Sequence, residues 1–201
     1  YGLKENHVNY AFVYGEDDKN YLIKSMNMNP DNIFISGYPF LQYVKHKYKS
    51  KQKINNQKKI ALYLTSGLRS VGVIPITINE EKYFYQKIYN ELNKSGYNLV
   101  LKLHPSENEN LFKSYFKNKN VEITKTSNLS DLTYESDIVI GEYTTAFFYP
   151  IRELKPIIII ESKYFNEYPF DFTKHGIGIK TDAENLSETI NKNYKLSLEN
   201  I

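Results

Sequence analysis

Two neighbouring threonines are placed where a phosphate could be bound. Thr144 and Thr145 follow the apolar residues 137–140 and a turn that starts at Gly141, and they precede a segment with helical spacing. Backbone N–H groups in the first turn of a helix lack partners and carry partial positive charge, so a helix that begins here offers an anion site. The same two residues could instead be an ordinary helix N-cap.

A histidine with a fixed backbone is the second candidate. His104 follows the apolar run 97–103 and precedes Pro105, which restricts it to extended geometry. Lys102 would share a strand face with His104 if the strand continues that far. An imidazole and an ammonium there could hold a phosphate or protonate a leaving phosphate oxygen. A solvent-exposed turn histidine is the alternative, because the role of a histidine depends on its surroundings.

Residues 65–72 form a third polar loop, which contains Ser66, Gly67 and Arg69. The guanidinium of Arg69 could make a bidentate contact with a phosphate, or it could be an ordinary surface group. Glu142 precedes the two threonines and could accept a hydrogen bond from a sugar hydroxyl. An exposed turn position would explain Glu142 equally well.

Composition and missing motifs exclude several classes of protein. The 201 residues include no cysteine, so disulfides and thiolate metal sites are excluded, and a net charge of +3 is too small to argue for nucleic acid. The other three histidines have no spacing that suggests a metal site. Dinucleotide-binding, P-loop and nucleophile-elbow motifs are absent. No signal peptide or membrane-spanning run is evident, and the start at Tyr1 suggests an excised piece of a longer protein.

Strands alternate with helices from residue 59 onward. Apolar runs predict strands at 59–64, 97–103, 121–124, 137–140 and 156–160. Helical spacing predicts helices at 80–95, 108–118, 128–135 and 146–154. A short strand at 176–180 and a helix at 183–194 complete the pattern.

This alternation is typical of an α/β protein with a Rossmann-like parallel sheet, helices on both faces and right-handed crossovers. Such a sheet binds its ligand outside the carboxyl ends of its strands. We therefore expect the loops 65–72, 104–106 and 141–145 to meet at one edge of the sheet.

The preceding part of the chain has its own pattern, with strands expected at 9–14 and 32–36 and helices at 16–26 and 40–48. Residues 45–59 are strongly basic, which fits a solvated linker or a surface for an anionic partner such as lipid headgroups or a glycan. We therefore expect a segment 1–45 that ends another domain, a basic linker 46–58 and a ligand-binding domain 59–201.

Several short motifs resemble the C-terminal, donor-binding half of GT-B glycosyltransferases. They are Leu101–Pro105, Ser136–Ile140, Glu142–Thr145 and Lys155-Pro156, in this order. The similarity is greatest to CDP-glycerol glycerophosphotransferases of teichoic acid synthesis and to bacterial sialyl- and polysialyltransferases, which carry a Lys-x-His-Pro element and a later Ser/Thr pair. Residues 9–39 also resemble the stretch that crosses between the two GT-B domains, so the resemblance covers roughly residues 9–165.

The resemblance implies a metal-independent transferase for bacterial surface polysaccharide, such as capsule, lipooligosaccharide or a teichoic-acid-like polymer. Its donor would be nucleotide-activated, CMP- or CDP-linked first of all, and its acceptor a glycan. His104 would be the catalytic contact to the donor phosphate, and Thr144 and Thr145 would bind phosphate through hydroxyl and backbone N–H groups. The remaining expected substrate contacts are Lys102, Pro105, Arg69, Ser66, Gly67, Glu142 and Tyr143.

The implied location is the cytoplasm, with association at the inner face of the membrane through residues 45–59 as one interpretation. The implied acceptor site and catalytic base would come from an N-terminal domain. The sequence departs from the related motifs in two places: Glu-Tyr-Thr-Thr replaces Asp-Tyr-Ser-Ser at 142–145, and Tyr149-Pro150 stands where many GT-B enzymes have a ribose-binding Glu. A UDP-GlcNAc 2-epimerase-like enzyme and a non-catalytic donor-domain scaffold are the two alternatives.

Overall fold

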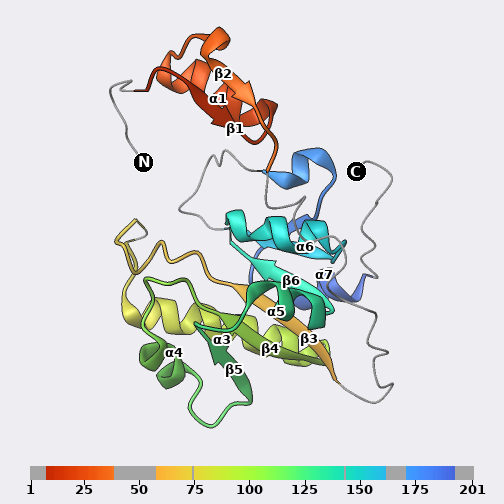
Figure 1. Cartoon of the computed structure of the whole chain (residues 1–201). Helices are drawn as coiled ribbons and strands as arrows, with labels where there is room; N and C mark the ends of the chain where they lie inside the picture. Colours follow the sequence, from red (N-terminus) through yellow and green to blue (C-terminus); the bar gives the residue numbers. More distant parts are fainter. Residues whose placement is uncertain (1–7, 39–57, 74, 143, 162–170, 193–201) are drawn as a thin grey trace. The chain divides into compact units, whose positions relative to one another are not determined.

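The computed structural model describes residues 8–38, 58–73, 75–142, 144–161 and 171–192. The first of these ranges belongs to one compact unit and the others to a second, larger unit (Figure 1). The predicted helix 40–48, nearly all of the basic segment 45–59, and Tyr143 lie outside the described residues.

The smaller unit is a strand–helix–strand element. Strands β1 (Ala11–Val13) and β2 (Ile33–Ile35) pair in parallel, with α1 (Glu16–Met26) and a 3₁₀ turn, η1 (Pro30–Asn32), between them. The Asp18 carboxylate starts the helix by accepting hydrogen bonds from the backbone N–H groups of Tyr14 and Gly15. Val13, Met28 and Ile33 form the small buried core. These elements agree with the predicted ranges, and both strands are shorter.

The larger unit contains a six-stranded sheet in which every strand pair is parallel, so the predicted sheet is confirmed. The strand order is β5-β4-β3-β6-β7-β8. The strands are β3 (Lys59–Leu64), β4 (Tyr97–Lys102), β5 (Val121–Thr124), β6 (Ile138–Gly141), β7 (Ile157–Ile160) and β8 (Ile179–Thr181). The order reverses direction between β3 and β6, which makes the carboxyl ends of these two strands the place for a ligand.

Helices lie on both faces of this sheet, because right-handed crossovers that run in opposite directions from the switch point put their helices on opposite faces. α3 contacts α4 and α7, whereas α5 contacts α6 (Figure 1). The helical elements are α3 (Ile78–Lys94), α4 (Glu109–Tyr115), α5 (Leu129–Glu135), η2 (Thr145–Phe147), α6 (Phe148–Arg152), η3 (Phe172–His175) and α7 (Leu186–Asn191). No described helix is long and apolar enough to cross a membrane.

The core explains why the central strands β3 and β6 are apolar along most of their length. Tyr63 of β3 and Ile140 of β6 belong to a buried cluster that includes Tyr85 of α3. The neighbouring residues Leu62 and Val139 are also fully buried and point to the opposite face, since strand side chains alternate. A parallel sheet covered on both faces requires this pattern.

For two of the elements that differ from the prediction, the reason is local. The expected strand 176–180 begins only at Ile179, because Gly176 and Gly178 both have positive φ angles. The expected helix 146–154 is a 3₁₀ turn followed by a short α-helix that ends at Arg152, and Leu154 is left-handed with φ +51°.

Candidate functional site

Loop 65–72 follows β3 and contacts both of the other polar loops at the carboxyl edge of the sheet. The register places Leu64 beside Lys102 of β4 and beside Gly141 of β6. The Ser66 hydroxyl donates to Glu142 (3.2 Å), and the Ser70 hydroxyl lies 2.7 Å from that of Ser106. The structure therefore brings the three loops together at the switch point.

A buried ion pair joins loop 65–72 to the turn after β6. Arg69 donates from both Nη atoms to the two carboxylate oxygens of Glu142, at 2.9 and 2.7 Å. The Arg69 side chain is 7% exposed and that of Glu142 is 0% exposed. Because each residue is occupied by the other, neither offers a free charged group to a ligand in this arrangement, although the sequence suggested a phosphate contact for Arg69 and a sugar contact for Glu142.

Aromatic rings hold the guanidinium of Arg69 in place. It lies 4.8 Å from the ring centre of Phe84 and 5.4 Å from that of Tyr85, and it donates to the Tyr85 hydroxyl at 3.3 Å. Burial opposes the charge of Arg69, but Tyr85 and Glu142 outweigh it, so the pKa of Arg69 lies above its ordinary value. The guanidinium is thus a permanent cation that holds the two loops together.

The backbone of His104 is fixed by two side chains that the sequence analysis did not single out. Its N–H donates to Thr65 Oγ1 and to a Glu107 carboxylate oxygen, each at 2.8 Å, and Thr65 also donates to Glu107. Glu107 is buried, and burial raises the pKa of its carboxyl, while the hydrogen bonds from Thr65 and His104 act in the opposite direction. Thr65 directly follows a predicted strand, which was the available signal for it.

The His104 side chain is exposed and lies against loop 65–72. Its Nδ1 atom is 2.8 Å from Ser106 Oγ, in the same turn. A Cβ added to Gly67 would lie 2.6 Å from His104 Cγ and 2.8 Å from Ser106 Oγ, so only glycine fits there. Gly67 has φ +69°, which also favours glycine. One side of the imidazole therefore packs against Gly67 and Ser106, and the rest of the ring is exposed to solvent.

Thr144 has the capping role that the sequence left open. Its hydroxyl accepts from the backbone N–H of Ala146 at 3.2 Å, at the start of η2. Thr145 is exposed, and no described residue bonds to its hydroxyl. The exposed Thr145 thus lies in the first turn after β6, at the carboxyl edge of the sheet.

Lys102 points toward the loop after β5. Its Nζ donates to the carbonyl of Lys125 at 2.6 Å, and Lys125 Nζ donates to the carbonyl of Glu107 at 2.9 Å. Burial lowers the pKa of Lys102. These bonds place the Lys125 ammonium beside the His104–Glu107 turn, which contains the exposed Pro105, and the Lys102 ammonium beside the Lys125 carbonyl. Lys125 was not predicted as part of the site.

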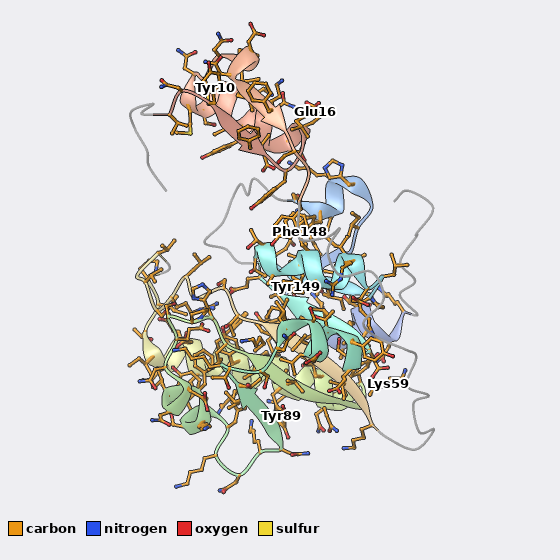
Figure 2. All side chains as sticks on the ribbon, in the orientation of Figure 1. Tyr10, Glu16, Lys59, Tyr89, Phe148 and Tyr149 are labelled. Atoms are coloured by element: carbon orange, nitrogen blue, oxygen red, sulfur yellow. The ribbon has the colours of Figure 1, made fainter. Side chains whose placement is uncertain are left out.

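The position where many GT-B enzymes have a ribose-binding Glu lies on α6. Tyr149 is half-buried there, with the Arg152 guanidinium 5.6 Å from its ring centre (Figure 2). Pro150 is buried in the same helix. The ribose contact of those enzymes therefore has no carboxylate counterpart at this position.

A cavity of about 670 Å³ lies on the α3 side of Arg69, next to the residues that follow β7 and β8. Carboxylates dominate its charged lining: Glu80, Glu161, Asp182 and Glu184 outnumber Arg69 and Lys87, and Arg69 is already paired with Glu142. The cavity is therefore unsuited to a phosphate. Within the described ranges, no group of three or more His, Cys, Asp or Glu residues could hold a metal ion.

Replacing Gly67 by Ala tests the packing of the His104 ring against Gly67. The natural control is Gly72→Ala, because Gly72 has a similar φ of +75° and no atom within 4 Å of an added Cβ. Both variants should lose about 1–2 kcal/mol of stability from the left-handed backbone. Only Gly67→Ala should also displace His104, seen as shifted ring signals in NMR spectra. Equal His104 shifts in the two variants would contradict this packing.

Three solved structures share the architecture at low sequence identity. UDP-GlcNAc 2-epimerase from Methanocaldococcus jannaschii, in complex with UDP-GlcNAc and UDP, has a TM-score of 0.68 and 14% identity, and the match covers 96% of this chain and 56% of the epimerase. The H444N variant of the wall teichoic acid polymerase TagF has a TM-score of 0.55 and 15% identity, and the match covers 94% of this chain and 49% of TagF. The glycosyltransferase SnogD from Streptomyces nogalater has a TM-score of 0.53 and 16% identity, and the match covers 91% of this chain and 47% of SnogD.

These likenesses define a GT-B fold, as the sequence motifs predicted. The chain spans about half the length of each of these proteins. No curated protein sequence matches it significantly. The family described as CDP-Glycerol:Poly(glycerophosphate) glycerophosphotransferase matches residues 2–169, and the chain belongs to this family.

Proposed function

We propose that the chain is the donor-binding part of a transferase that builds a bacterial surface polymer from a CDP-linked donor. The family match over residues 2–169 carries this proposal. The fold supports it, because three polar loops meet at the switch point of a parallel sheet, where such folds bind their ligands. Structures of TagF, including one soaked with CDPG, are among the similar folds.

In this proposal the donor diphosphate lies between His104 and the turn after β6. The Thr145 hydroxyl and N–H donate to phosphate oxygens, and Thr144 keeps the turn in its capped form. His104 donates from its exposed side, and Lys102 and Lys125 add positive charge from the neighbouring loop. Arg69 and Glu142 touch no ligand and fix the loops that do.

The reaction would be a direct displacement at the donor. Negative charge develops on the leaving nucleotide phosphate, and donors that are already in place stabilise it without reorganisation. His104 and the turn at Thr145 are these donors. The acceptor site and the catalytic base would come from parts of the protein outside this chain, which spans about half of its structural neighbours.

Further features of the proposal come from the resemblance. They are independence from metal ions, a glycan-like acceptor, and action at the inner face of the membrane through the basic segment 45–59. Capsule or lipooligosaccharide synthesis and a CMP-linked sialyl donor are the finer variants of the same proposal. Teichoic-acid-like chemistry ranks first among them because of the family match.

Two other functions make different predictions about the ligand. The epimerase from Methanocaldococcus jannaschii has the higher TM-score of the three structures, and an epimerase-like function would require a preference for uridine nucleotides. A non-catalytic scaffold would bind no nucleotide at all. The departure at Tyr149-Pro150 is the feature that favours the scaffold.

Isothermal titration calorimetry of the 201-residue chain with CMP, CDP, UMP and UDP decides among these functions. We expect CDP to bind at least about tenfold more tightly than UDP, because a site that hydrogen-bonds one base leaves groups unpaired with the other. A uridine preference would replace the proposal with UDP-sugar chemistry. Absence of binding for all four nucleotides would overturn the proposal that this chain holds the donor site.

A further inference from the structure

A chain of hydroxyl groups connects the His104 ring to a backbone carbonyl of the neighbouring loop. We propose that Ser70 and Ser106 are positioning residues that hold a proton on His104 Nδ1, so that Nε2 is the nitrogen that faces the ligand. The arrangement has the role that a carboxylate has beside a catalytic histidine, but it uses neutral groups.

Three short hydrogen bonds form the chain. His104 Nδ1 is 2.8 Å from Ser106 Oγ, Ser106 Oγ is 2.7 Å from Ser70 Oγ, and Ser70 Oγ is 2.7 Å from the carbonyl oxygen of Gly67. Each distance lies in the normal range for a hydrogen bond. The chain spans two loops that are 36 residues apart in the sequence.

The carbonyl at the end sets the direction of all three bonds. A carbonyl oxygen can only accept, so the Ser70 hydroxyl donates its one hydrogen to Gly67. Ser70 Oγ must then accept from Ser106, which has no second hydrogen for the imidazole. Ser106 Oγ therefore accepts from His104, and the hydrogen between them belongs to Nδ1.

One contact favours the opposite tautomer. The backbone N–H of Ser106 points at His104 Nδ1 at 3.2 Å, which needs a lone pair on that nitrogen. Reversal of the chain would satisfy this longer bond and would break the 2.7 Å bond from Ser70 to Gly67. Because Ser106 is exposed, water can satisfy its N–H, and the three shorter bonds prevail.

Apart from the Ser106 N–H, no described group beside the ring opposes this tautomer. Glu107 binds the backbone N–H of His104 and not its ring, and Gly67 covers one side of the ring without a side chain. Among the described residues, Ser106 is the only hydrogen-bond partner of the ring. Nε2 thus has no hydrogen-bond partner among the described residues, while Nδ1 is bonded to Ser106.

The consequence for binding rests on the proposed function. When the ring is charged, Nε2–H donates to a phosphate oxygen and Nδ1–H still donates to Ser106. When the ring is neutral, Nε2 presents a lone pair that repels the phosphate. The serine pair therefore keeps one ring orientation in both charge states, with Nε2 toward the ligand.

Long-range ¹H–¹⁵N NMR correlations of the neutral ring test the tautomer directly and without a ligand. In the wild-type chain, Nδ1 of His104 should have a protonated-type shift and Nε2 an unprotonated-type shift. Ser106→Ala should change the major tautomer to Nε2–H, which imidazole favours in water, and Ser70→Ala should move the population in the same direction. Ser106→Thr keeps a hydroxyl and should restore the wild-type pattern.

Ser66→Ala is the matched control, because Ser66 lies in the same loop and bonds to Glu142 instead. It should leave the His104 shifts unchanged. A wild-type ring in the Nε2–H form, or a Ser106→Ala ring that keeps Nδ1–H, would overturn the inference. Nucleotide titration is a separate readout: a chain that binds no nucleotide refutes the proposed donor site and leaves the tautomer result standing.

Discussion

Replacing Glu142 by Gln should destabilise the larger unit by about 3–5 kcal/mol, because it leaves the buried guanidinium of Arg69 without its counter-charge. The glutamine is nearly the same size, so lost packing contributes little. Chemical denaturation followed by circular dichroism measures the change as a lower midpoint. The bidentate geometry is combined with exposures of 0% and 7%, which make this the most buried ion pair among the described residues.

Glu109→Gln is the control for charge removal at the surface. Glu109 pairs with Lys113 along α4 at 2.6 Å, but the two side chains are 34% and 56% exposed. Its loss should cost about 0.5 kcal/mol or less, since water screens such pairs. A Glu142→Gln cost as small as this would show that the Arg69–Glu142 pair does not hold the loops.

A double variant separates the pair from its two charges. Arg69→Met with Glu142→Gln removes both charges, so no buried ion is left alone. Its stability should exceed that of Glu142→Gln alone, because replacing a whole buried pair is often nearly neutral whereas breaking one is not. A loss equal to the sum of the two single losses would contradict this coupling.

The sequence predicted the sheet well because burial on both faces requires continuous apolar runs. The ranges 59–64 and 121–124 agree with β3 and β5, and the others differ by a few residues. Since parallel strands share one edge for their carboxyl ends, the meeting of three loops could also be foreseen. Which side chains pair within those loops could not be foreseen. Arg69 and Glu142 are 73 residues apart, and such a pair leaves no local pattern in the sequence.

Helix ends were less predictable because single contacts decide them. α3 begins at Ile78 and not at residue 80, since Thr77 and Glu80 form a reciprocal cap. That cap could have been read from the Thr-x-x-Glu spacing. In contrast, the Thr65–Glu107 clamp on His104 depends on the register of β3 against β4, which places Thr65 beside the end of β4.

Replacing His104 by Ala should weaken CDP binding by roughly tenfold to a hundredfold, the worth of one hydrogen bond to a charged group. The fold should be unaffected, because Thr65 and Glu107 hold the backbone of residue 104 and alanine keeps that N–H. Calorimetric titration with CDP, beside a denaturation curve, measures both effects. The selectivity for cytidine should be retained, since the lost contact is to phosphate and not to the base.

His175→Ala is the matched control, because His175 is the other histidine in the described ranges and lies in η3, away from the three loops in sequence. It should leave the CDP affinity unchanged. If His104→Ala binds CDP as tightly as the wild-type chain, then the imidazole is not a phosphate contact. The Thr145 turn, Lys102 and Lys125 would then have to supply the affinity for CDP. The hydroxyl chain of Ser70 and Ser106 would then connect the two loops without affecting the ligand.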